Sequence, residues 1–478
     1  MKKRIFCLLL AALLLVSCGN ESTAETETAA DTAAVTETAA AETEETLAGP
    51  DIPDTTYDGA DFTIYSRENT EPYFVVEEQT GDLLNDARFD LMAMLEEKFA
   101  VDMIEIQGAG DKNGDKARDA LLAGDSTYEM LSGHYRIMCT AYAQNELACD
   151  WYSLPYIDFD NQWWDKNMLE SLSIGGKMYV LIDDLTVDAI RTTKCLLINK
   201  DLFREYNIPL PYEAALDGTW TFDMFEEICK QFSSDLNGDG KLDAANDRFG
   251  FSSTVWGASM NILWTAGQRI VDFTGEGGRM EYVVNNEIAV DVYDTFFAFM
   301  AQDYTLLAKD TTELYGAFRE GRIAMRGAGM GDIYEERDLE YDIGVMPYPK
   351  FYAEQENYCT GVDAGSNGLV IPVTIEDPDM VSAVTEYWAY LQYRDVLPVF
   401  YEKVCKTKAA RDEETALILD LVRDSRFYDI GYFYGSLPMN SIGADLSGSG
   451  GNFASYYAGN EAMAKAALDE INAYYFGE

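Results

Sequence analysis

Strand-like and helix-like segments alternate at the start of the long apolar-rich part of the chain. Short apolar runs that suit buried strands occur at 62–65, 103–106 and 128–131. Between them, 85–99 and 117–123 repeat apolar residues at helical spacing. Because parallel strands need a long crossover, usually a helix, this order predicts a parallel sheet covered by helices. We therefore expect an α/β fold.

The length of the chain indicates more than one such unit. Of the 478 residues, roughly 430 follow the N-terminal region described next, which is more than one ordinary hydrophobic core holds. We therefore expect two lobes. The 84 acidic residues outnumber the 35 basic ones and give a net charge of −49. So acidic a chain argues against nucleic acid as a partner and favours a neutral or cationic ligand, although the acidity also suits the solubility of an exported protein.

The first residues have the pattern of a bacterial export signal. A basic start precedes an apolar run, 5–16, that is too short for a comfortable membrane span. The run ends in Leu-Val-Ser before Cys18, which resembles a lipoprotein processing site. We predict a signal peptide at 1–17 and a lipid-anchored Cys18 on the extracellular side of the cell membrane; the alternative is an ordinary secretion signal that contains this cysteine. Residues 18–50, mainly Ala, Thr and Glu, are expected to form a disordered acidic tether.

Two groups of side chains in the N-terminal half are candidates for ligand binding. Arg67 and His134 follow predicted strands, and ligands of parallel sheets bind beyond the carboxyl ends of strands. Trp163 and Trp164 stand next to a carboxylate in a predicted loop. Such a pair can stack on the apolar face of a sugar ring, or it can pin a loop to the core.

Several short motifs, taken in order, carry a resemblance to a known family. They are Gly176-Lys177-x-Tyr179, Leu197-Ile198-Asn199-Lys200, Gly218-Thr219-Trp220, Phe318-Arg319-Glu320-Gly321-Arg322 and Pro347-Tyr348-Pro349-Lys350. In this order and spacing the chain resembles the extracellular solute-binding proteins of carbohydrate ABC importers. The resemblance implies a type II periplasmic-binding-protein clamshell with an α/β sandwich in each lobe and several strands in the hinge. It also implies a monomer that binds an oligosaccharide or other small neutral solute and docks on ABC permease subunits.

The same resemblance suggests the lobes and further ligand-binding residues. We expect 51–186 with 322–368 in the first lobe, and 187–321 with 369–478 in the second. Aromatic residues after a second-lobe strand often line the sugar site in this family, which indicates Trp256 and, less strongly, Trp264. Arg326 and Asp363 could bind sugar hydroxyls bidentately, or they could form a salt bridge between the lobes.

An acidic loop predicts a metal site. Asp235, Asn237, Asp239, the carbonyl of Lys241 and Asp243 match the first, third, fifth, seventh and ninth positions of a calcium-binding EF-hand loop, with glycine sixth. The glutamate normally found at the twelfth position is missing, and Asp247 one residue later could replace it. The loop thus indicates a structural calcium ion, with an acidic turn as the alternative; we expect no other cofactor.

Most enzyme classes are excluded by the residues themselves. The single histidine, His134, rules out multi-histidine metal sites, and there is no G-x-S-x-G elbow, Walker loop or strand-associated G-x-G-x-x-G. The six cysteines after Cys18 show no metal-ligand spacing and are expected to be buried thiols. We therefore expect no enzymatic activity. A glycoside hydrolase, which needs only two carboxylates, and a glycan-binding adhesion lipoprotein remain as alternatives.

Overall fold

The computed structural model describes residues 47–68, 74–108, 115–336, 338–401 and 413–477. The predicted signal peptide, Cys18 and nearly all of the tether lie outside these residues. Residues 48–478 form one compact unit. No helix among the described residues has the length and apolar character needed to cross a bilayer.

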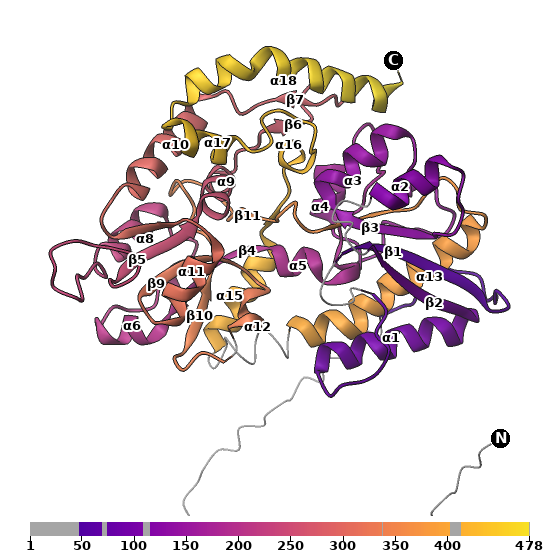
Figure 1. Cartoon of the computed structure of the whole chain (residues 1–478), viewed down its shortest axis with the longest axis horizontal. Helices are drawn as coiled ribbons and strands as arrows, with labels where there is room; N and C mark the ends of the chain where they lie inside the picture. The colour runs from indigo at the N-terminus through magenta and orange to yellow at the C-terminus, as the bar shows by residue number, and fades with distance from the viewer. Residues whose placement is uncertain (1–46, 69–73, 109–114, 337, 402–412, 478) are drawn as a thin grey trace, which may run out of the picture. The chain divides into compact units, whose positions relative to one another are not determined.

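The first sheet contains the strand–helix alternation expected from the sequence (Figure 1). Its order is β12 (Asn367–Val370), β3 (Met130–His134), β1 (Ala60–Arg67) and β2 (Val101–Gly108). β1 pairs in parallel with both β2 and β3, as predicted, whereas β12 joins the edge of β3 in the antiparallel direction. Helices α1 (Leu83–Phe99) and α2 (Asp115–Leu122) fall on the predicted helical segments.

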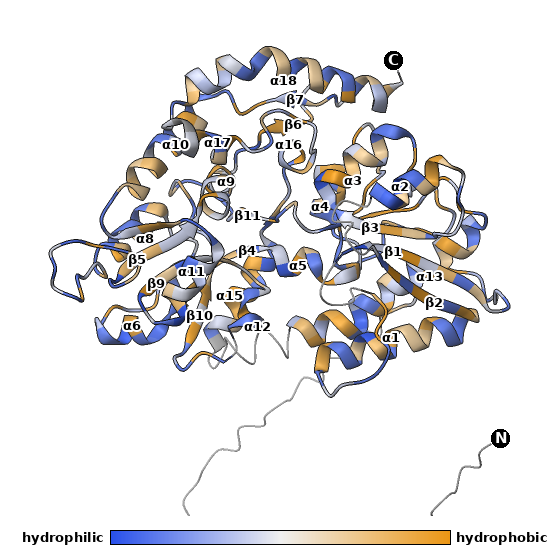
Figure 2. Ribbon diagram, viewed as in Figure 1, coloured by the Kyte–Doolittle hydropathy of each residue, from blue (hydrophilic) through white to orange (hydrophobic). Residues whose placement is uncertain are grey.

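Local sequence explains these elements. Asp82 accepts hydrogen bonds from the N–H groups of Leu84 and Asn85 and so caps α1, whose buried face includes Leu95 and Phe99. The strand β2 lies at the edge of its sheet, and its first three residues are buried, exposed and buried in turn. Figure 2 colours this strand alternately hydrophobic and hydrophilic, the pattern of a strand with one face packed on the core.

The second sheet is larger and mixed. Its order is β10 (Ile343–Met346), β4 (Lys194–Asn199), β9 (Ile323–Gly329), β5 (Phe249–Thr254) and β8 (Thr305–Ala308). β5 is parallel to β8 and β9, and β4 is antiparallel to β9 and β10. Two small ribbons pair β6 (Val271–Asp272) with β7 (Glu281–Tyr282), and β11 (Thr360–Gly361) with β13 (Arg426–Phe427).

The helices complete both lobes. Those that follow β3, up to residue 265, are α3 (Tyr135–Ala141), α4 (Lys166–Leu172), α5 (Asp188–Thr192), α6 (Lys200–Glu205), α7 (Tyr212–Leu216), α8 (Phe222–Cys229) and α9 (Val255–Thr265). Those that follow are α10 (Glu287–Met300), α11 (Thr311–Arg319), α12 (Asp332–Glu335), α13 (Pro378–Leu391), α15 (Glu413–Asp424), α16 (Ile430–Phe433), α17 (Ile442–Ser449) and α18 (Phe453–Phe476). In Figure 1, α5 lies between the two sheets, where the chain first passes from one to the other.

The pairing of strands differs from the predicted lobe boundaries. The sequence predicts residues 322–368 in the first lobe, but β9 and β10 within that range pair in the second sheet. The chain returns to the first sheet only at β12. Residues 369–478 were assigned to the second lobe, yet Trp388 of α13 packs edge-to-face on Phe74, with ring centroids 5.5 Å apart, next to the first sheet. Long-range pairing decided these segments, and no local pattern in the sequence encodes it.

The described cysteines are free thiols, as expected, but only three of the five are fully buried. Free thiols are found at Cys139, Cys149, Cys195, Cys229 and Cys359. Cys139, Cys195 and Cys229 are buried, and burial raises the pKa of the Cys149 and Cys359 thiols. Cys405 lies outside the described residues.

Candidate ligand-binding cleft

A cavity of about 450 Å³ lies where the second sheet meets the segments that lead to the first. The strands β5 and β9 end at it and β4 begins at it, because β4 runs antiparallel to β9. Its lining comes from four places in the sequence: Asp188 to Lys194; Ser253 to Gly257; Thr311 to Glu335; and Tyr348 to Gly365. This is the edge of an α/β sheet at which ligands are expected, and we call it the cleft.

The backbone at Gly327 forms part of the cleft wall, because a residue without a side chain can lie close to Ser253 and Tyr348. A methyl group on Gly327 would lie 2.6 Å from both the Ser253 Oγ and the Tyr348 hydroxyl. Any larger residue would therefore displace these two polar side chains, which line the cleft. Tyr348 and Ser253 are themselves buried.

Trp256 is an aromatic residue of the cleft wall whose side chain is exposed to solvent. It stands in the first turn of α9, where the Thr254 side chain accepts a hydrogen bond from the N–H of Gly257 and caps the helix. Half of its surface, 50%, is exposed, and it lines the cleft. The guanidinium carbon of Arg136, in α3 beside the first sheet, lies 5.9 Å from its ring centroid. The predicted site residue Trp256 is thus at a place where it can stack on a ligand.

Asp363 also lines the cleft, and it is held as an anion. Lys194 Nζ lies 2.6 Å from Asp363 Oδ2, the Gly365 N–H donates to Oδ1 at 2.7 Å, and the Tyr432 hydroxyl donates to Oδ1 at 3.2 Å. Burial alone would raise the pKa of Asp363, but the Lys194 charge and these donors outweigh it and lower the pKa to about 2. The carboxylate can therefore accept hydrogen bonds but holds no proton near neutral pH.

The strand-end rule predicts Arg67 and His134 in the ligand cleft; the structure places both beside Asp363, but neither lines the cleft itself. Arg67 Nη2 donates to the Gly365 carbonyl oxygen at 3.1 Å. An ideal Cβ on Gly365 would be 3.8 Å from His134 Nε2, so the imidazole approaches the same turn. Burial, followed by the charges of Arg67 and Arg136, lowers the pKa of His134 to about 4. The histidine is neutral at physiological pH, first because burial disfavours its charged form and then because these cations oppose its protonation.

Trp163 and Trp164 lie in the core instead of the cleft. They are 5% and 2% exposed, and their indole N–H groups donate to Glu386 of α13 at 3.0 and 3.1 Å. The Asn161 amide donates to the same carboxylate at 2.8 Å. Burial raises the pKa of Glu386 to about 7, although these donors lower it. The geometry supports the reading in which the pair pins a loop to the core.

Trp264 is a core residue as well. It is 1% exposed, and its indole N–H donates to Asp429 at 3.1 Å. Its ring packs so closely on Gly361 that a Cβ there would lie 2.0 Å from it. The preference for Trp256 over Trp264 agrees with this packing, although the sequence does not show which side of α9 is covered.

Arg326 lies beneath the cleft. It is completely buried and pairs with Asp332 at 3.0 Å and Glu336 at 3.1 Å. Both partners follow β9 in the same lobe region, so the bridge does not join the two sheets. Arg326 therefore acts on the cleft by fixing Asp332, which lines it.

The acidic loop satisfies its carboxylates with its own backbone. Asp235 accepts from the N–H groups of Gly238 and Gly240 at 2.6 and 2.8 Å, and the buried Asp247 accepts from those of Leu236 and Asp243 at 2.9 and 2.8 Å. Within the part of the chain that the structure describes, no three acidic, cysteine or histidine side chains converge on a point that could hold a metal. The oxygen-rich donors suit calcium, but they would have to turn away from these amides to bind it. Calcium binding stays a prediction.

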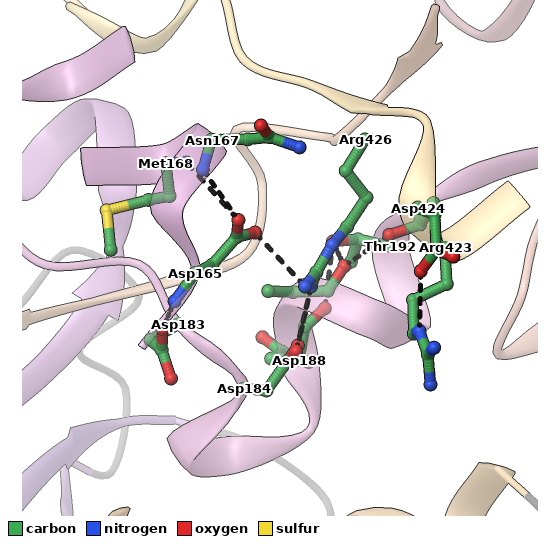
Figure 3. A network of polar contacts seen from close by, with 12 residues as sticks. Asp165, Asn167, Met168, Asp183, Asp184, Asp188, Thr192, Arg423, Asp424 and Arg426 are labelled. Carbon is green, nitrogen blue, oxygen red and sulfur yellow. Dashed lines mark hydrogen bonds and ion pairs between the residues drawn. The ribbon is translucent and has the colours of Figure 1, made fainter. Parts of the chain in front are cut away.

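Arg426 joins segments that connect the two sheets. Its Nη1 lies 2.9 and 2.8 Å from the two oxygens of Asp184, and its Nη2 lies 3.1 Å from Asp165 Oδ2 (Figure 3). Asp165 also caps α4 by accepting from the N–H groups of Asn167 and Met168. All three ionic side chains are 10% exposed or less. No local pattern indicates this arginine's role, since its partners lie more than two hundred residues away in the sequence.

Arg136, Arg191 and Lys194 were also missed. Arg136 follows His134 by two residues, so the strand-end rule that selected the histidine could have included it. Arg191 and Lys194 flank the end of α5 and line the cleft. Nothing local distinguishes them from surface cations.

Comparison with known proteins gives the fold its context. No protein-family model and no curated protein matches the sequence. Solved structures do match it. One is the maltose/maltodextrin-binding domain MalE from Bdellovibrio bacteriovorus bound to maltotriose, with 15% identity and a TM-score of 0.53 over 87% of this chain and 99% of that one. The fold is that of an ABC-transporter solute-binding protein.

Two further matches support the same fold. A cyclo/maltodextrin-binding protein complexed with maltotetraose has 13% identity and a TM-score of 0.55, covering 88% of this chain and 97% of that one. An ABC transporter solute-binding protein from Thermotoga lettingae bound to tagatose has 14% identity and a TM-score of 0.51, covering 87% and 100%. The predicted α/β clamshell is confirmed.

Proposed function

We propose that this chain is a lipid-anchored receptor that captures an oligosaccharide and delivers it to an ABC importer. The observation that carries the proposal is the half-exposed Trp256 in a polar cleft of about 450 Å³, in a fold whose solved relatives hold saccharides. Flat aromatic rings bind the apolar faces of sugars, and charged or polar groups around them bind the hydroxyls.

The state of the cleft carboxylates favours binding over hydrolysis. A glycoside hydrolase needs one protonated acid and one base on opposite sides of the scissile bond. Asp363 has a pKa lowered to about 2 and is paired with Lys194, and Asp332 is paired with Arg326. Asp188 accepts the Asn367 N–H at 2.9 Å. With its lowered pKa and its lysine partner, Asp363 cannot serve as the protonated acid of a hydrolase, which supports a receptor that returns its ligand intact.

Ligand-dependent stability tests the proposal. Thermal unfolding of the full-length protein is measured with a panel of saccharides and polyols. At 100 times its dissociation constant, a ligand stabilises a folded protein by about 2.7 kcal/mol. Trp256→Ala should abolish most of this shift, whereas Tyr152→Ala, an exposed aromatic outside the cleft, should leave it unchanged. A saccharide that is cleaved would favour the hydrolase, and a protein stabilised by no member of the panel would contradict the proposal.

The anchor is tested separately. Cys18→Ala should release the protein from the membrane fraction into the medium, because a processed lipoprotein without its acylated cysteine has no anchor. A variant that stays with the membrane would show that Cys18 is not the attachment point. Neither result changes the expectation for saccharide binding.

A further inference from the structure

Three arginines around the cleft have no carboxylate partner among the described residues. They are Arg67, Arg136 and Arg191, which come from β1, α3 and α5. Arg67 Nη2 donates to the uncharged Gly365 carbonyl oxygen. Carboxylates outnumber basic side chains by 84 to 35 in this chain, so three arginines that form no ion pair with a described carboxylate need an explanation.

Arg136 is held in place by aromatic rings, and no described residue accepts a hydrogen bond from its guanidinium. Its guanidinium carbon lies 5.9 Å from the Trp256 ring centroid and 5.3 Å from that of Tyr432. Such cation–π contacts orient the planar group, but a ring supplies no oxygen acceptor for the guanidinium N–H groups. These N–H groups remain available beside the aromatic surface on which a sugar would stack.

Arg191 is positioned by backbone packing. Its own carbonyl oxygen accepts the N–H of Gly331 at 2.9 Å, and a Cβ on Gly331 would lie 3.2 Å from its Nε. The side chain is half-buried and lines the cleft together with Trp256. A guanidinium in such a position offers a planar fork that matches the two oxygens of a carboxylate.

The carboxylates that line the cleft are mostly neutralised or engaged already. Lys194 pairs with Asp363 and Arg326 with Asp332. Asp188 accepts a backbone N–H, and Glu335 is exposed at the end of α12. An incoming anion would therefore meet arginine donors more directly than unpaired acidic oxygens, although the chain as a whole is strongly acidic.

We propose that the saccharide bound in the cleft is acidic, with carboxylate or sulfate groups received by Arg136 and Arg191 while a sugar ring stacks on Trp256. This inference rests on the proposed receptor function and specifies its ligand. It reverses the expectation of a neutral or cationic ligand from net charge, because a binding site responds to the charges within a few ångströms and distant exposed charges are screened.

Three ligand arms test the proposal on the full-length protein in mild detergent, by tryptophan fluorescence and calorimetry. The first contains uronate oligosaccharides of two to four residues, the second their carboxyl-reduced neutral forms, and the third sulfated oligosaccharides. We expect the uronate or the sulfated arm to bind at least 10-fold more tightly than the neutral arm, and the arm that wins identifies the anion.

Variants connect the preference to the arginines. Arg136→Ala and Arg191→Ala should each weaken binding of the acidic ligand by roughly 10- to 100-fold, the loss expected for a hydrogen bond to a charged group. Binding of the neutral form should change less than about 3-fold. Arg136→Gln keeps most of the side chain if the alanine variant unfolds. Arg204→Ala, an arginine 61% exposed on α6, is the matched control and should bind like the parent.

The outcomes separate this inference from the function on which it rests. Equal or tighter binding of the neutral arm, or arginine variants that keep the preference for the acidic ligand, would overturn the acidic-ligand inference and leave the receptor proposal standing. Binding of no saccharide in any arm would contradict both.

Discussion

Replacing Arg426 by methionine should destabilise the protein strongly. Methionine keeps most of the volume but removes three contacts of 2.8 to 3.1 Å to Asp184 and Asp165. Because these groups are 10% exposed or less, the substitution leaves two buried carboxylates without their cation. Breaking a buried pair in this way costs about 3–5 kcal/mol, mostly through the unpaired charge that remains.

The size of the shift follows from the chain length. An unfolding entropy of about 2.1 cal/mol/K per residue over roughly 430 residues gives about 0.9 kcal/mol/K, so the midpoint should fall by about 3–5 °C. Urea unfolding followed by tryptophan fluorescence provides the free energy independently. Arg204→Met is the matched control, since that arginine also contacts two aspartates but is 61% exposed, and its loss should stay below about 1 kcal/mol.

A triple variant tests whether the loss of stability comes from the two unpaired carboxylates. Adding Asp165→Asn and Asp184→Asn to Arg426→Met removes the stranded charges, and asparagine at 165 can still cap α4. It should recover at least about 1–2 kcal/mol of the loss. A single Arg426→Met variant less than about 1 kcal/mol below the parent, or a triple variant less stable than the single one, would show that these carboxylates do not depend on the arginine.

Three other predictions concern separate parts of the molecule. Glu386→Leu should cost about 2–4 kcal/mol in urea unfolding, because it leaves two buried indole N–H groups and an amide without their acceptor, yet saccharide affinity should not change; an affinity loss above 10-fold would place that loop in the site. The pKa of Asp363 is lowered to about 2, and its side chain, paired with Lys194, is 31% exposed. The pair should therefore stabilise the fold above about pH 4, and about 1–2 kcal/mol of this stability should be lost as the pH falls through 2. Asp363→Asn should flatten the curve of stability against pH in that window, and an unchanged curve would contradict the prediction. Calcium should raise the unfolding midpoint if the acidic loop binds it, and the double variant Asp235→Asn with Asp239→Asn should remove the rise; a rise that survives would locate calcium elsewhere.

The sequence predicted the local elements of the first sheet well. The segments at 62–65 and 128–131 became β1 and β3, because apolar periodicity is a property of neighbouring residues. The sequence did not predict the sheet to which β9 and β10 belong, because their partner strand β4 lies more than a hundred residues earlier. A strand's pattern shows that it is buried but not which sheet receives it.

The candidate site was predicted unevenly for a similar reason. Trp256 and Asp363 line the cleft, whereas Trp264 and Arg326 are buried beside or beneath it. All four are residue types that bind sugars, and only tertiary packing decides which of them reach the ligand. The strand-end rule could have included Arg136, but only the structure shows that its guanidinium lies over the Trp256 ring.

The interleaved strands affect the order in which the protein can fold. The edge of β3 stays unpaired until β12 arrives, although Leu131 and its partner Val370 are separated by about half of the chain. Pairings so distant in sequence close slowly, and an uncovered strand edge is a place where chains associate with one another. A nascent chain of this topology therefore stays incompletely folded until most of it has been synthesised. For a chain that begins with an export signal of the predicted kind, this delay keeps it in the unfolded form that a secretion channel accepts, and it makes a holding chaperone valuable on the way.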